Sequence, residues 1–62
     1  MDKLVIFRYL GGLAVTKKSN FESHIWDANK ITTCRNFESP QEIIDYYKKW
    51  FHADETDFEI HI

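Results

Sequence analysis

Residues 4–17 read LVIFRYLGGLAVTK, and this stretch decides the fold. Its two arms are rich in β-branched and aromatic residues, which favour β-strands. Gly11 and Gly12 lie between the arms and can adopt the positive φ angles of a two-residue hairpin turn. The pattern predicts an antiparallel hairpin in which Leu10 opposes Leu13.

The two faces of this hairpin differ in composition. The aliphatic face is expected to pack on a helix and carries Leu4, Ile6, Arg8, Leu10, Leu13 and Val15, whereas the opposite face carries Val5, Phe7, Tyr9, Ala14, Thr16 and Lys18. One helix covers one face of a sheet, so we expect the aromatic face to remain uncovered. Contiguous exposed apolar patches mark interfaces. The alternative is that the twist of the sheet and the residues near Phe21 wrap these rings into one small core.

Two further strands are expected after the hairpin. Residues 18–22 are polar and are predicted to form a loop. His24–Trp26 and Ile31–Cys34 are predicted strands, and Asp27–Lys30 between them has the composition of a type I turn.

The strongest local signal in the chain is Ser39-Pro40-Gln41-Glu42. Ser39 can cap a helix, Pro40 suits the first helical position and Glu42 completes a capping box. We therefore predict a helix over residues 40–52. Its apolar side chains fall within an arc of about 160°; they are Ile43, Ile44, Tyr46, Tyr47, Trp50 and Phe51. Trp50, like Trp26, is expected to add to the apolar surface that has no visible cover.

The end of the chain predicts a last strand, because Phe58, Ile60 and Ile62 alternate with polar residues. This strand can lie parallel to the first, with the helix as the crossover. The predicted fold class is α+β: a small antiparallel or mixed sheet of four to five strands packed on one C-terminal helix, in the order β-β-β-β-α-β. Residues 1–62 are expected to form a single domain.

Composition limits the classes of function. The chain is 44% hydrophobic and 16% aromatic, which is too high for a disordered protein. Sixty-two residues are too few to enclose a large substrate cavity or an elaborate cofactor site, so no cofactor is expected.

The single cysteine indicates the kind of cellular compartment in which the protein is expected. Cys34 cannot form an intramolecular disulfide, and secreted proteins of this size usually carry several. We therefore expect a reducing, cytoplasmic location and interpret Cys34 as a small buried residue in a strand. No apolar run reaches the length of a membrane span, so no membrane association is expected.

The sequence contains no pattern typical of a catalytic or metal site. His24, His52 and His61 are far apart and lack the spacing of metal ligands. A nucleophile needs an adjacent base, and the predicted pairing places Cys34 and His24 on opposite faces. We expect neither an enzyme nor a metalloprotein.

The remaining signals favour binding. Trp, Tyr and Arg dominate many interfaces, so we predict a partner-binding surface made by Phe7, Tyr9 and Trp26, with Arg35 nearby. The acidic residues Asp54, Glu55, Asp57 and Glu59 can occupy a basic site on another protein. The resulting hypothesis is a small protein-interaction module, acting as an inhibitor or adaptor on a partner protein or as a homodimer.

Nucleic-acid binding is the alternative hypothesis. Aromatic rings on a sheet can stack on bases when cations flank them, and the β-rich half holds Arg8, Lys17, Lys18, Lys30 and Arg35. The formal net charge of -2 argues against this alternative, because nucleic-acid-binding domains are usually basic.

Overall fold

The computed structural model describes residues 3–62. One mixed sheet has the strand order β3-β2-β1-β4. Its strands are β1 (Leu4–Tyr9), β2 (Gly12–Lys17), β3 (Thr32–Cys34) and β4 (Phe58–His61), and the helical elements are α1 (Lys18–Glu22), α2 (Pro40–Phe51) and the 3-10 turn η1 (Glu55–Asp57). Strand β2 is antiparallel to both of its neighbours, and β4 runs parallel to β1. The fold is therefore a small α+β fold, and the last strand takes the position parallel to the first that the sequence left open.

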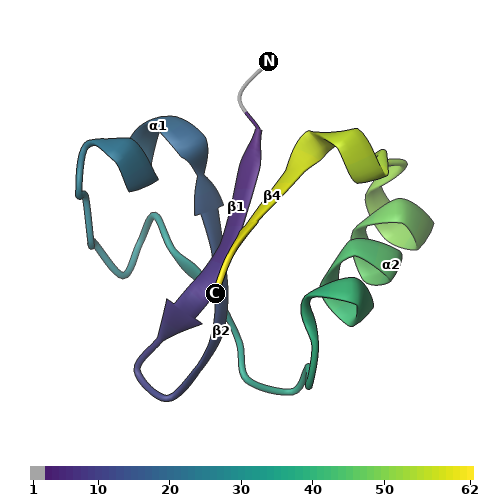
Figure 1. The fold of residues 1–62 in the computed structure, drawn as a ribbon, viewed down its shortest axis with the longest axis horizontal. Helices are drawn as coiled ribbons and strands as arrows, with labels where there is room; N and C mark the ends of the chain where they lie inside the picture. The colour runs from purple at the N-terminus through teal and green to yellow at the C-terminus, as the bar shows by residue number, and fades with distance from the viewer. Residues whose placement is uncertain (1–2) are drawn as a thin grey trace.

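The sheet lies between two layers of different thickness. Figure 1 shows α1 and the following loop on one side of the strands and α2 on the other. The α2 side holds a core built from Ile6, Leu13, Val15, Cys34, Ile43, Ile44 and Phe58. The α1 side holds a second core built from Val5, Phe7, Ala14 and Ile31.

The hairpin turns at Leu10 and Gly11 rather than at the two glycines. Their φ angles are 51° and 80°, and both are positive, as type I′ hairpin turns require. Gly12 lies in β2 opposite Tyr9, and an ideal Cβ at this position would meet Arg35 Cγ at 3.0 Å. The absence of a side chain at Gly12 thus makes room for Arg35. The register differs by two residues from the expected one, which leaves every side chain on its expected face because strand side chains alternate with a period of two.

The structure of residues 18–31 differs from the sequence-based prediction in two places. Lys18–Glu22 forms the helix α1 instead of a loop, and residues 24–26 form no strand. Phe21 of α1 and Ile31 pack onto the hairpin face that was expected to be uncovered. Val5 is fully buried there and Phe7 is 5% exposed. The expectation of an uncovered face is therefore wrong at Val5 and Phe7.

Helix α2 begins as the sequence predicts. The capping box is formed by Ser39 and Glu42, and the Glu42 carboxylate accepts hydrogen bonds from the backbone N–H of Glu38 at 2.6 Å and of Ser39 at 3.4 Å. The helix ends at Phe51, and His52 closes it in the left-handed conformation with φ 54°. This residue turns the chain toward η1 and β4.

Candidate functional site

Aromatic side chains of α2 form a continuous exposed cluster. Tyr46, Trp50 and Phe51 are 42%, 61% and 62% exposed. The ring centroid of Tyr46 lies 6.4 Å from that of Trp50 and 6.1 Å from that of Phe51. Two half-buried rings join the cluster, since Phe37 lies 5.6 Å from Tyr46 and Tyr47 lies 5.3 Å from Phe51. We call these five rings the α2 aromatic surface.

The direction in which α2 faces the sheet explains why these rings are exposed. Ile43 and Ile44 are buried against the sheet, and the half-buried Tyr47 lies between them in helical projection. Tyr46 and Trp50 lie at one margin of the apolar face by helical geometry, and Phe51 is the last residue of the helix. The expectation that Trp50 and Trp26 lack a cover is confirmed, and most of the exposed aromatic surface lies on α2 rather than on the hairpin.

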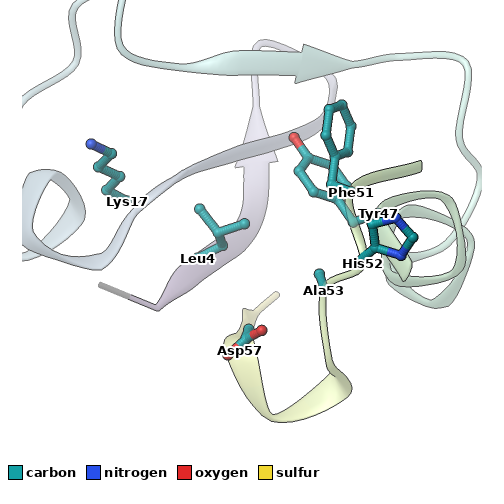
Figure 2. A pocket seen from close by; sticks show the side chains of 7 residues that line it. All are labelled: Leu4, Lys17, Tyr47, Phe51, His52, Ala53 and Asp57. Carbon is teal, nitrogen blue, oxygen red and sulfur yellow. The ribbon is translucent and has the colours of Figure 1, made fainter. Parts of the chain in front are cut away.

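A pocket of about 590 Å³ opens beside the α2 aromatic surface. Figure 2 shows its lining residues, which come from the ends of β1 and β2 on one side and from the end of α2 and the following segment on the other: Leu4, Lys17, Tyr47, Phe51, His52, Ala53 and Asp57. Tyr47 and Phe51 belong to both the pocket and the aromatic surface. A mostly apolar pocket with a few polar groups is typical of sites that take an apolar group of a ligand or a partner.

Two titratable groups close to this site are kept neutral. Burial raises the pKa of Tyr47, and the neighbouring Cys34 and Tyr46 raise it further. Burial also raises the pKa of the Cys34 thiol, whose Sγ lies 3.8 Å from the carbonyl oxygen of Thr32. The interpretation of Cys34 as a small buried residue in a strand is confirmed.

The predicted aromatic interface residues lie on the other side of the sheet. The ring centroid of Phe7 is 5.9 Å from that of Tyr9 and 5.6 Å from that of Trp26. Phe7 is buried, Tyr9 is half-buried and Trp26 is exposed. The structure thus brings the three rings together, but mainly as the wall of the second core. Arg35 is exposed beside the hairpin turn, where its Nη2 donates a hydrogen bond to the Leu10 carbonyl at 3.3 Å.

The predicted acidic residues fall into two groups. In the turn η1, the Asp54 N–H donates to Asp57 Oδ2 at 3.0 Å, and Glu55 lies 3.4 Å from Lys48 Nζ. Asp57 also lines the pocket, so this turn adjoins the α2 aromatic surface. Glu59 is separate, because its Oε2 lies 2.6 Å from Lys18 Nζ at the start of α1.

The contact between Lys18 and Glu59 shifts both groups toward their charged forms. The hydrogen bond from Lys18 lowers the pKa of Glu59, and a second one from His61 lowers it further. The same hydrogen bond to Glu59 raises the pKa of Lys18. The pair is therefore charged around neutral pH and ties α1 to β4.

Metal-ligand clusters and membrane-spanning helices are both absent from residues 3–62. This part of the chain contains no group of three or more His, Cys, Asp or Glu side chains placed to hold a metal ion. None of its helices has both the length and the apolar character that a membrane crossing requires.

Protein-family models, curated proteins and solved structures give no match to this chain. The fold and the site define a small α+β protein whose sheet is covered on both faces. Its most prominent surface feature is an aromatic helix beside an open pocket.

Proposed function

We propose that this protein is a non-enzymatic interaction module that binds a partner protein through the α2 aromatic surface and the adjoining pocket. The observation that carries this proposal is the set of three large exposed aromatic side chains, Tyr46, Trp50 and Phe51, in which the ring of Tyr46 lies next to both of the others. Exposed apolar patches mark interaction sites, and Trp and Tyr contribute most of the binding energy at many interfaces. Such a module acts as an inhibitor or adaptor by occupying a surface of its partner.

The chemistry of the site defines the partner that fits it. The apolar wall formed by Leu4, Tyr47 and Phe51 suits an apolar side chain of the partner. Asp57 and Lys17 both line the same pocket, so its rim carries charges of both signs. The proposed partner is therefore a protein surface that places an apolar side chain in the pocket and polar groups around it.

The geometry favours a protein partner over a nucleic acid. Stacking on bases requires accessible rings, whereas Phe7 on the basic half of the chain is buried. Lys18 on the same half is held by Glu59. A gel shift with single-stranded nucleic acid, weakening steeply with salt, would support the alternative.

The proposal is tested by comparing two matched tryptophan variants in affinity capture from the producing cells. Trp50→Ser removes the centre of the exposed cluster, and Trp26→Ser makes the same change on the opposite side of the sheet. We expect Trp50→Ser to lose the specifically captured protein and Trp26→Ser to retain it, with far-UV circular dichroism confirming that both variants fold. Capture that depends on Trp26 and not on Trp50 would overturn the proposal.

A further inference from the structure

Strand β4 has an outer edge to which no strand of residues 3–62 pairs, because the sheet order places it last after β1. The free N–H and C=O groups of an edge strand are a template for another strand. Ile60 and Ile62 near this edge are 53% and 59% exposed. Helices α1 and α2 lie to either side of the sheet (Figure 1).

We propose that a second copy of this chain pairs antiparallel with β4 about a two-fold axis at Ile60, so that the two four-stranded sheets become continuous. In this register Ile60 faces its own equivalent, Phe58 faces Ile62 of the other copy and Glu59 faces His61 of the other copy. Directly opposed side chains point to the same face of a sheet. All apolar pairs therefore fall on the α2 side and both Glu59–His61 pairs on the α1 side.

The alternation of side chains selects this register. A two-fold axis normal to the sheet must pass through a residue position. A half-residue position would oppose neighbouring residues, whose side chains point to opposite faces, whereas directly opposed side chains share a face. An axis at Glu59 would oppose two carboxylates, and like charges directly opposite each other are destabilising. An axis at His61 would oppose two imidazoles and leave Glu59 without a facing histidine. The axis at Ile60 gives complementary pairs on both faces.

The geometry of Glu59 supports the pairing. Its Oε2 is held at 2.6 Å by Lys18 Nζ, and its Oε1 lies 3.4 Å from Nε2 of His61 in the same chain. A carboxylate offers about four acceptor positions, so the oriented group retains capacity for His61 of a second copy. The edge of β4 is thus self-complementary in its side-chain pairs, as an isologous interface requires.

The first experiment measures the mass of the full chain by sedimentation velocity from micromolar to millimolar concentration. Pairing over a few residues buries less than the roughly 800 Å² per partner of a standard interface, so the association is concentration-dependent. We expect the average mass to double over this range. Ile60→Lys, which opposes two cations at the axis, is expected to abolish the dimer. Leu10→Lys makes the same kind of change at the exposed hairpin turn and is expected to retain it.

The second experiment fixes the register with two matched cysteine variants, Ile60→Cys and Ile62→Cys, oxidised with glutathione disulfide. Residue 60 of each copy faces its equivalent, whereas the two residues 62 lie roughly 14 Å apart at about 3.4 Å per residue, beyond disulfide reach. We expect rapid disulfide-linked dimers from Ile60→Cys alone, with buried Cys34 remaining free.

A wild-type chain that remains monomeric at every concentration would overturn this inference, as would equal cross-linking of the two cysteine variants. Trp50→Ser is expected to leave the dimer intact, because Trp50 lies on α2 and not on β4. Failure of this inference is therefore distinguishable from failure of the proposed partner site.

Discussion

The ring of Phe21 lies 5.3 Å from the ring of Phe7, centroid to centroid, in an edge-to-face arrangement. This contact places α1 over the hairpin and makes the second face of the sheet a core. Trp26 completes the cover at 5.6 Å from Phe7. The aromatic residues of the hairpin therefore contribute to stability, while Tyr46, Trp50 and Phe51 of α2 are exposed and accessible to the proposed partner.

This division predicts that two truncations change the free energy of unfolding by very different amounts. Phe7→Ala removes a buried ring and is expected to cost about 3–5 kcal/mol, close to the ~3–5 kcal/mol that one small core supplies. Trp50→Ala removes an exposed ring and is expected to change stability by about 0.5 kcal/mol. Urea unfolding followed by far-UV circular dichroism measures both. Similar losses from the two variants would contradict the two-core description.

The hairpin turn predicts a stabilising substitution. Leu10 holds a φ of 51°, a conformation that costs L-residues about 1–2 kcal/mol. Leu10→Asn creates the Asn-Gly pair that type I′ turns prefer, and it is expected to raise stability by about 1 kcal/mol. Leu10→Ala is the control, because it also removes the exposed leucine side chain but keeps the unfavourable backbone. A gain shared equally by both variants would show that the turn geometry is not the cause.

The ion pair between Lys18 and Glu59 predicts that the stability of the folded chain depends on pH. The pKa of Glu59 is lowered in the folded chain by the hydrogen bond from Lys18, so its contribution is present above the usual carboxyl range and is lost as the pH falls through that range. The pKa of Lys18 is raised by the same bond, so its contribution is lost at alkaline pH above the usual lysine range. Glu59→Gln is expected to lower Tm slightly at neutral pH and to leave it unchanged in acid. In a Lys18→Met background the difference at neutral pH should disappear; its persistence would assign the effect to another contact.

The elements with strong local signals could be predicted from the sequence. The capping box at Ser39 and Glu42 marks the start of α2, and the alternation after Phe58 marks β4. Helix α1 could not be predicted, because Lys18–Glu22 is a single turn with one apolar residue and has no periodicity to detect. Its position depends on the tertiary contact between Phe21 and Phe7.

The gathering of exposed aromatic rings on α2 could not be predicted from the sequence for a related reason. Helical periodicity groups Tyr46 and Trp50 with the other apolar residues of α2, but only the tertiary packing shows that Ile43 and Ile44 face the core while these two rings are exposed. The pocket joins Leu4 to Phe51 and Ala53, which are distant in the sequence. No local pattern carries that information.

The central claim is that the partner binds the α2 side of the molecule, and site-specific photo-cross-linking in the producing cells tests it most directly. In the first variant a benzophenone amino acid replaces Lys49, whose Nζ lies 5.3 Å from the Trp50 ring centroid. In the control variant it replaces the exposed Lys30, which lies beyond the other face of the sheet. We predict a discrete cross-linked protein from position 49 that disappears with Trp50→Ser, and none from position 30. A cross-link from position 30 alone would contradict the account.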